Sequence, residues 1–365
     1  MKFVDEYRDP ALARALVDAI LERATRPWTI MEVCGGQTHA ILAHGLDALL
    51  AERVTLLHGP GCPVCVTPLE TLDRALALAE RGARLCSFGD MLRVPGSRGD
   101  LLGARARGGD VRVVYSPFDA VRLAAAEPDR EVVFLAVGFE TTAPAVAAAA
   151  RWVLARDLSN FHLLVSHVRV PPALEAIAAA PGAQVEAFLA AGHVCTVMGT
   201  AEYEPIAQRH RLPVVATGFE PVDILEGVAM AVAQLEAGAS RVEIQYRRAV
   251  RPEGNPAARA LVDEVFEVVD RPWRGIGVVP RGGLALRGPY AALDAVTAFP
   301  ALAGEAPREP AACRAGDVLR GSIRPPACPE FGRGCTPERP LGAPMVSSEG
   351  ACAAYYHYRA AGGPA

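Results

Sequence analysis

The hydrophobic positions of this chain occur mainly in short continuous runs, with little alternation between apolar and polar residues. The runs are rich in β-branched residues, and a glycine-containing loop follows most of them. Such runs are typical of parallel strands that are covered on both faces. We predict strands at Trp28–Val33, Arg53–His58, Arg84–Ser87, Val111–Tyr115, Glu131–Val137, Phe161–Ser166, His193–Met198 and Leu212–Ala216.

Alanine- and leucine-rich stretches with helical spacing separate the runs, and prolines stand near their starts. They predict helices at Leu69–Ala79, Ala145–Ala155, Ala173–Ala179 and Ile224–Leu235. The alternation of strand, loop and helix predicts an α/β fold with two doubly wound, Rossmann-like parallel-sheet domains.

A short repeated motif supports a division of this region into two units, because Gly138-Phe139-Glu140 and Gly218-Phe219-Glu220 each follow a predicted strand. We therefore expect one α/β domain at residues 27–118 and a second at 119–236. A third region, residues 237–365, contains Val278–Leu286, which reads as a strand or hairpin, and then a proline-rich end that excludes long helices. Residues 1–26 are expected to pack on this third region.

Composition and charge exclude several classes of function. The chain has 365 residues, of which 51% are hydrophobic and 21% charged, and its formal net charge is -4. No basic block or aromatic-plus-basic motif is present, so we expect no nucleic-acid role. We also expect no signal peptide and no membrane span, because no apolar run reaches the necessary length without interruption. A cytoplasmic location is the expectation.

The nine cysteines are divided between two parts of the chain. Cys34 and the pair Cys62/Cys65 lie in glycine-rich loops after the first two predicted strands, whereas four others crowd the end: Cys313, Cys328, Cys335 and Cys352. An odd count in a reducing compartment favours metal ligation or redox chemistry over structural disulfides. Because ligands of an open parallel sheet bind beyond the carboxyl ends of its strands, we expect both upstream loops to face one cleft.

The upstream cysteines admit more than one role. Cys62 and Cys65, two residues apart, suit a redox dithiol, which we favour over half a zinc site because no second such motif is present. The glycines after Cys34 allow close approach of a ligand, which fits a nucleophile or a ligand of a transient metal; the alternative is a buried thiol. Cys86 and Cys195 lie within apolar runs, and we interpret them as packing residues.

Other polar residues at strand ends are equally open to two interpretations. His39 and His167 either transfer protons or bind metal, or else are local hydrogen-bond partners. Glu140 and Glu220 are either bases or acceptors at helix starts. For the four terminal cysteines we favour an iron-sulfur cluster over structural zinc, because the dithiol would give an electron carrier a partner. Glu349 is expected beside that cluster.

Six segments together resemble the HypD family of hydrogenase maturation factors: Met31–His39, Gly59–Pro68, Gly138–Pro144, Ser166–Pro172, Gly218–Leu225 and Met345–Tyr356. The resemblance spans nearly the whole chain. It implies a redox-active scaffold that assembles the Fe(CN)2CO part of the [NiFe]-hydrogenase site together with the small chaperone HypC, with cyanide delivered from HypE. It also implies a [4Fe-4S] cluster in the C-terminal domain, and we expect a monomer within a hetero-complex.

Carried over to this sequence, the resemblance implies that Cys34 holds the transient iron and that Cys62/Cys65 is the redox dithiol. It implies cluster ligation by Cys313, Cys328, Cys335 and Cys352, and supporting roles for His39 and Glu349. Two positions depart from the family pattern, since Gln37 and Pro344 replace the histidine and the extra cysteine of some members. The alternative function is a thiol-disulfide oxidoreductase with a structural zinc site.

Overall fold

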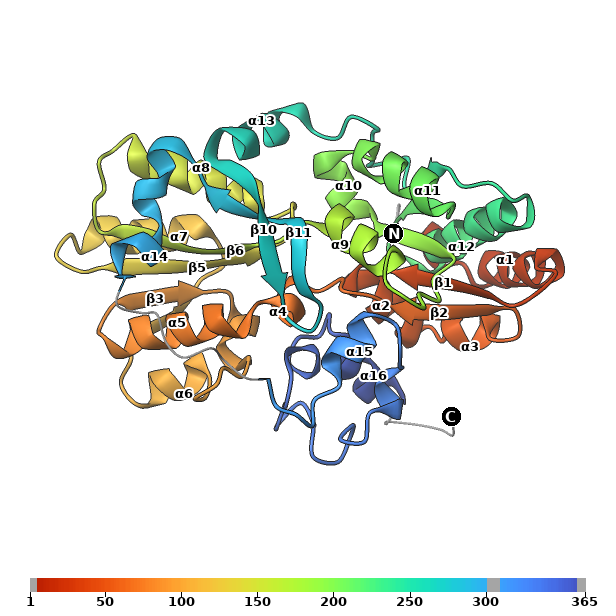
Figure 1. The fold of residues 1–365 in the computed structure, drawn as a ribbon, viewed down its shortest axis with the longest axis horizontal. Coiled ribbons are helices and arrows are strands. Elements are labelled where there is room, and N and C mark those ends of the chain that lie inside the picture. The colour runs from red at the N-terminus through yellow and green to blue at the C-terminus, as the bar shows by residue number, and fades with distance from the viewer. Residues whose placement is uncertain (1–4, 301–308, 360–365) are drawn as a thin grey trace.

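The computed structural model describes residues 5–300 and 309–359, and its architecture is α/β (Figure 1). Within these residues, one parallel sheet has the strand order β2-β1-β7-β8-β9 and a second has the order β4-β3-β5-β6. The strands of the first sheet are β1 (Trp28–Glu32), β2 (Val54–His58), β7 (Ala187–Ala191), β8 (Val214–Thr217) and β9 (Val242–Ile244). Those of the second are β3 (Arg84–Ser87), β4 (Val111–Val113), β5 (Val132–Gly138) and β6 (Phe161–His167).

Helices connect and cover the strands, and most of the predicted helices are confirmed at nearly the expected bounds. The α-helices are α1 (Pro10–Arg23), α2 (Gly35–Ala43), α3 (Leu46–Leu50), α4 (Pro63–Val66), α5 (Leu69–Glu80), α6 (Leu101–Ala106), α7 (Pro117–Ala126), α8 (Ala143–Leu154), α9 (Val170–Ala178), α10 (Gly192–Met198), α11 (Glu204–His210), α12 (Pro221–Glu236), α13 (Pro256–Val265), α14 (Ala295–Ala298), α15 (Ala315–Leu319) and α16 (Ala351–Arg359). Short 3-10 helices are η1 (Asp5–Arg8), η2 (Gly89–Arg93), η3 (Ala201–Tyr203), η4 (Gly288–Leu293), η6 (Pro325–Ala327) and η7 (Ala343–Met345).

The central strand β5 shows why the apolar runs do not alternate. All seven of its residues are buried. Val132, Phe134 and Ala136 pack with α7 and α8, whereas Val133, Leu135 and Val137 pack with α5 and α6. Both faces of the strand are thus covered by helices, as predicted for a parallel sheet in an α/β fold.

One predicted strand is wrong. The segment His193–Met198 lies in helix α10, and the strand in this part of the chain is β7, which precedes it. β7 has the sequence Ala-Phe-Leu-Ala-Ala, whose alanines give little strand signal, whereas Val194 and Val197 in α10 imitate one. Burial among the surrounding elements decides the outcome, because Phe188 and Leu189 are fully buried.

The two sheets do not follow the expected division at residue 118. β1 and β2 share a sheet with β7, β8 and β9, while β3 and β4 pair with β5 and β6. The first sheet therefore draws its strands from both ends of the α/β region. Its neighbour is formed from the continuous segment between them.

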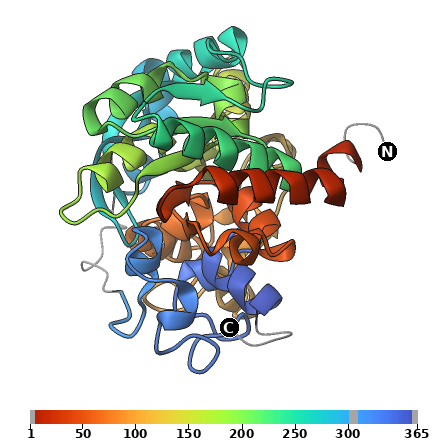
Figure 2. The ribbon, with the colours of Figure 1, turned by 90° about the vertical axis from the view of Figure 1, so that its right-hand side faces the viewer.

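The remaining segments pack against these sheets. β10 (Phe266–Trp273) and β11 (Gly277–Leu286) form an antiparallel hairpin, so the hairpin interpretation of Val278–Leu286 is confirmed. Helix α1 packs on α12 and α3 at the first sheet and not on the cysteine-rich end (Figure 2). Residues 309–359 form mostly loops below α2 and α4 in Figure 1, with α16 packed on α2.

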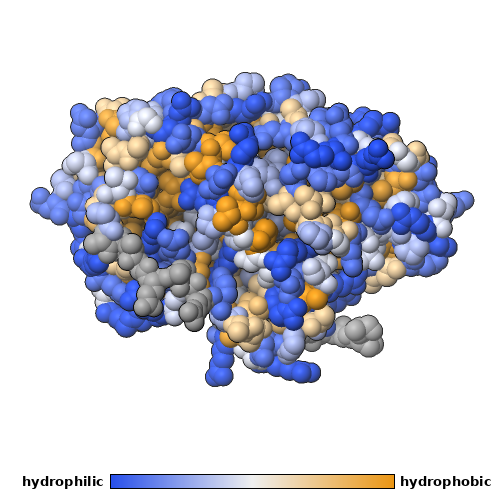
Figure 3. Space-filling view, in the orientation of Figure 1, coloured by the Kyte–Doolittle hydropathy of each residue, from blue (hydrophilic) through white to orange (hydrophobic). Residues whose placement is uncertain are grey.

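The molecular surface is mixed in polarity. In Figure 3, polar residues dominate the rim of the molecule, and apolar residues gather nearer the middle of this face. Two valines of the hairpin, Val268 and Val278, are exposed. Among the helices of the described segments, we find none with the length and apolarity needed to cross a membrane.

Candidate functional site

Cys34 lies where the first sheet changes its direction of winding. From β1 the chain proceeds to β2 on one side, and from β7 to β8 on the other, so the crevice between the ends of β1 and β7 is the topological switch point. Cys34 directly precedes α2 after β1, and His193 is the second residue of α10 after β7. The Sγ of Cys34 lies 3.6 Å from Nδ1 of His193.

The thiol and the imidazole are both held in their neutral forms. Cys34 is 1% exposed, and burial raises the pKa of its thiol. The nearby Glu32 carboxylate raises this pKa further, whereas the N–H groups of Gln37 and Gly36 lower it. Burial lowers the pKa of His193 to about 4. A buried thiol becomes a strong ligand when a cation replaces its proton. The pair therefore suits a metal ion better than a free thiolate nucleophile.

The loop that carries the dithiol lies directly against Cys34. The N–H of Gly35 donates to the carbonyl oxygen of Gly61 over 3.0 Å. A Cβ at Gly61 would stand 2.2 Å from the backbone nitrogen of Cys34, so only glycine permits this approach. The two upstream cysteine loops thus lie against each other, as their positions after neighbouring strands predict.

Cys62 and Cys65 form a disulfide. Cys62 caps α4, and its Sγ accepts a hydrogen bond from the Cys65 N–H at 3.2 Å. The two residues are 2% and 1% exposed, respectively. A bulky external disulfide therefore has no open route to these sulfurs.

Aromatic side chains and an amide complete the surroundings of Cys34. The Phe219 ring lies 5.3 Å from the His193 ring and 5.6 Å from the Tyr246 ring. The amide of Gln37, fully buried, donates to the carbonyl oxygens of Thr217 and Gly218 at 3.1 and 3.2 Å. Gln37 therefore connects α2 to the end of β8 through hydrogen bonds from its amide group.

The two residues expected to support the site lie on its outer side. His39 is exposed, and the hydroxyl of Tyr358 on α16 lies 3.0 Å from its Nε2. Glu349 packs against Gly35, where an added Cβ would stand 2.3 Å from the Cβ of Glu349. Glu349 is exposed overall, but its carboxyl group is partly shielded from water. This desolvation raises the pKa of the carboxyl, and the negative charge of Asp90 raises it further.

At the ends of the second sheet, two buried groups have strongly shifted pKa values. Glu140 accepts the N–H of Val170 at 3.0 Å, and burial raises the pKa of its carboxyl to about 7. His167 lies 3.2 Å from the carbonyl oxygen of Gly138, and burial lowers its pKa to about 4. By contrast, Glu220 caps α12 and pairs with Arg8. Cys86 and Cys195 are fully buried packing residues.

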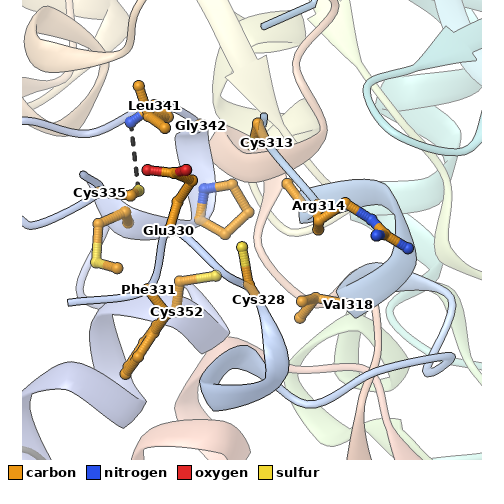
Figure 4. Close-up of a pocket in the computed structure, with 13 residues that line it drawn as sticks. Cys313, Arg314, Val318, Cys328, Glu330, Phe331, Cys335, Leu341, Gly342 and Cys352 are labelled. Atoms are coloured by element: carbon orange, nitrogen blue, oxygen red, sulfur yellow. Dashed lines mark hydrogen bonds between the residues drawn. The ribbon is translucent and has the colours of Figure 1, made fainter. Parts of the chain in front are cut away.

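The four terminal cysteines line one pocket. Cys313 precedes α15, Cys328 and Cys335 lie in loops, and Cys352 is the second residue of α16; Figure 4 shows the four around the same space. The lining is otherwise mainly apolar: Ala315, Val318, Phe331, Leu341, Pro344 and Met345. In the described residues no three side chains of the types His, Cys, Asp and Glu are grouped closely enough to hold a single metal ion.

The pocket shows local adaptation to its sulfurs. The N–H of Leu341 donates to the Sγ of Cys335 at 3.4 Å (Figure 4). A Cβ at Gly342 would stand 2.5 Å from the Sγ of Cys313, so this glycine makes room for the sulfur. Burial raises the pKa of Cys352, and the negative charges of Cys313, Cys335 and Cys328 add to this effect.

A single short element connects the pocket to the dithiol. Helix η7 contributes Pro344 and Met345 to the pocket, and the same helix packs against α4, which contains Cys65. Pro344 thus lines the pocket beside the four cysteines. The contacts of η7 with α4 and of α16 with α2 therefore bring the segment of the four terminal cysteines beside the dithiol and Cys34 loops.

Sequence reasoning missed His193, because it placed this residue inside a strand. It also passed over Glu32 and His58, which lie beneath the two loops. Glu32 is the next-to-last residue of one predicted strand and His58 ends the other, each shortly before a cysteine loop, and an ionisable residue at such a position in an otherwise apolar run was the available signal.

Comparisons with known proteins agree with the resemblance seen in the sequence. The HypD family model, described as "Hydrogenase formation hypA family", matches residues 11–359. The hydrogenase maturation factor HypD of Escherichia coli (strain K12) is 47% identical over 368 residues, which cover 98% of each chain. The proteins of the same name from Rhizobium leguminosarum bv. viciae and Rhodobacter capsulatus are 47% and 44% identical, again over 98% of this chain, and over 96% and 98% of their own lengths.

Proposed function

The chain belongs to the HypD family of hydrogenase maturation factors, and we propose that it is the cytoplasmic scaffold on which the Fe(CN)2CO unit of [NiFe]-hydrogenase is assembled. In this function it works with a HypC-type chaperone and receives cyanide from a HypE-type donor. The observation that carries the proposal is the position of Cys34: its sulfur lies 3.6 Å from His193, directly beside the Cys62–Cys65 loop.

The iron is cargo, and Cys34 is the residue proposed to hold it. Removing the thiol proton becomes favourable when Fe(II) takes its place, and burial then keeps water away from the iron. His193 is neutral and can accept the thiol proton or offer its nitrogen to the metal. The Phe219 ring beside His193 keeps this space apolar.

The C-terminal pocket fits a [4Fe-4S] cluster. Four thiol sulfurs are the usual ligand set of such a cluster, and Cys313, Cys328, Cys335 and Cys352 would hold it. Burial in this apolar pocket and the other three cysteines raise the pKa of Cys352. The positive charge of bound iron would lower this pKa and favour the thiolate. When bound, the cluster supplies electrons.

The Cys62–Cys65 disulfide is the group of this chain that would accept such electrons. Reduction of the Cys62–Cys65 disulfide breaks the S–S bond and consumes two electrons and two protons, giving two thiols. Because η7 packs against α4, the dithiol lies next to the region of the tetrad. The dithiol is in turn adjacent to Cys34, which supports the proposal that it keeps the iron-binding thiol reduced.

Metal and infrared analysis test the proposal. Anaerobically purified protein should contain iron and sulfide, and its complex with the chaperone should show CN and CO infrared bands. Cys34→Ala should remove these bands and keep the cluster, whereas Cys86→Ala, which alters a packing cysteine, should keep both. Bands of wild-type intensity in Cys34→Ala, or in a Cys62→Ala/Cys65→Ala variant, would contradict the assigned roles of these residues.

The alternative is a thiol-disulfide oxidoreductase with structural zinc. Its support is the Cys62–Cys65 disulfide itself, but both sulfurs are buried, which argues against turnover of external disulfides. A protein with stoichiometric zinc, without iron or sulfide, would favour this alternative.

A further inference from the structure

A fully buried carboxylate lies beneath the two upstream cysteine loops. Glu32 is the last residue of β1 and is 0% exposed. An isolated charge in such a place would be very costly, so its hydrogen-bond partners are essential. Its Oε2 accepts the N–H of Cys34 at 2.7 Å, and its Oε1 accepts Nδ1–H of His58 at 2.7 Å as well as the hydroxyl of Thr38.

Through these partners, Glu32 joins both loops. Cys34 begins the first loop, and His58 is the last residue of β2, directly before the loop that leads to Cys62. The main chain repeats the connection, because the carbonyl oxygen of Glu32 accepts the N–H of Gly59 at 2.8 Å. One residue therefore fixes the start of the iron-binding loop and the start of the dithiol loop.

The same pair reaches the C-terminal region. The His58 ring lies edge-on to the ring of Tyr355, with centroids 5.5 Å apart, and Tyr355 is three residues after Cys352 on α16. His58 Nε2 and the Tyr355 hydroxyl are both buried, and neither has a hydrogen-bond partner within the described part of the chain. His58 is thus held by Glu32 on one side and by the cysteine-rich region on the other.

We propose that Glu32 and His58 are positioning residues that hold the Cys34 loop against the Cys62 loop and so set the rate at which these two cysteines react. The proposal rests on the role of Cys34 and the dithiol given above. It concerns geometry alone: Glu32 accepts and His58 donates, and neither needs to touch iron. Hydrogen bonds to a charged acceptor are the stronger ones, so their loss should misplace the loops measurably.

The test measures cross-linking between Cys34 and Cys62 in the full-length chain carrying Cys65→Ser. Diamide oxidises the two thiols, accepts their two electrons and two protons to become a hydrazine, and leaves an S–S bond between Cys34 and Cys62. The rate is followed by mass spectrometry of the linked peptides. Glu32→Gln should slow it at least about tenfold, because an amide has only one acceptor oxygen: its N–H group must face either the N–H of Cys34 or the Nδ1 of His58 and the hydroxyl of Thr38, and the hydrogen bonds on that side are weakened or lost.

A second pair of variants decides the case if Glu32→Gln fails to fold. His58→Asn keeps a donor near the position of Nδ1, whereas His58→Leu removes it, so the asparagine variant should retain most of the rate and the leucine variant should lose it. A matched control is Glu131→Gln, which breaks the 2.8 Å pair of His162 and Glu131 in the second sheet and should leave the rate unchanged.

Three results would overturn the proposal: equal rates in folded Glu32→Gln and its parent, equal rates in the two His58 variants, or no Cys34–Cys62 bond in the parent. Thermal unfolding of each variant separates loss of rate from loss of fold. The measurement needs no iron, cyanide or chaperone. Failure of the assembly function would therefore appear in metal and infrared analysis while this rate could still respond to Glu32.

Discussion

Glu140 should make the stability of the protein depend on pH near neutrality. Its carboxyl is 3% exposed, and burial raises its pKa from the ordinary 4.5 to about 7, although Arg169 and the N–H of Val170 act in the opposite direction. The folded state thus binds the proton more tightly than the unfolded chain does. This contribution to stability is fully present below the unfolded pKa and is lost as the pH rises through the folded one.

The size of the effect follows from the two pKa values. Between pH 5.5 and 7 the folded carboxyl is largely protonated and the unfolded one is not, and each pH unit costs about 1.4 kcal/mol, so wild-type protein should lose about 2 kcal/mol. Glu140→Gln retains an acceptor for Val170 and cannot ionise. Relative to wild type, it should therefore gain about 2 kcal/mol between pH 5.5 and 8.5.

Thermal unfolding of wild type and Glu140→Gln at both pH values measures this difference, in which the titration of other groups cancels. Glu220→Gln, at the equivalent position of the second Gly-Phe-Glu sequence, is the control and should leave the pH dependence in place. Infrared difference spectra provide a direct check, since the protonated carboxyl band at pH 6 should be absent from Glu140→Gln. A pH-independent difference together with an unchanged carboxyl band would refute the reasoning.

Three further outcomes follow from the geometry of the cysteine sites. Gly342→Ala places a Cβ 2.5 Å from the Sγ of Cys313 and should lower the iron and sulfide content of the purified protein. Wild-type iron and sulfide content in this variant would contradict the expectation. Gly61→Ala forces a Cβ against the Cys34 backbone and should destabilise the fold by about 1–3 kcal/mol, measured by thermal unfolding. Gly89→Ala, whose Cβ would meet only an ordinary contact at 3.7 Å, is the control for both. Iron removal by a chelator should lower the Tm, because a ligand of the native state stabilises it; an unchanged Tm would count against a resident cluster.

Much of the α/β layout was readable because parallel strands that are buried on both faces leave continuous apolar runs, as in β5 and β6. β7 was missed because alanine carries little strand preference, and its buried position depends on neighbours far away in sequence. The error also hid His193, which begins a helix beside Cys34 once β7 is placed correctly.

The composition of the two sheets could not be read from local patterns. Which strands share a sheet is decided by long-range pairing, such as that of Ile30 with Ala187, and no periodicity reports it. His39 shows a second limit. His39 follows Cys34 by five residues, which is about 1.4 turns of a helix, so the two side chains lie on different sides of α2. The side chain of His39 therefore faces Tyr358 on α16. The proximity of Cys34 to the Gly61–Cys62 loop, by contrast, followed from the strand ends.

The interrupted first sheet has a consequence for biosynthesis. β1 and β2 leave the ribosome early, yet β1 gains its neighbour β7 only after about 130 further residues have been made, and β9 follows still later. During this interval the second sheet, whose strands are contiguous in sequence, is free to fold first. Cys34 and His193 meet only when the late strands dock, so a nascent chain has no assembled metal-holding pair until most of its length has been translated.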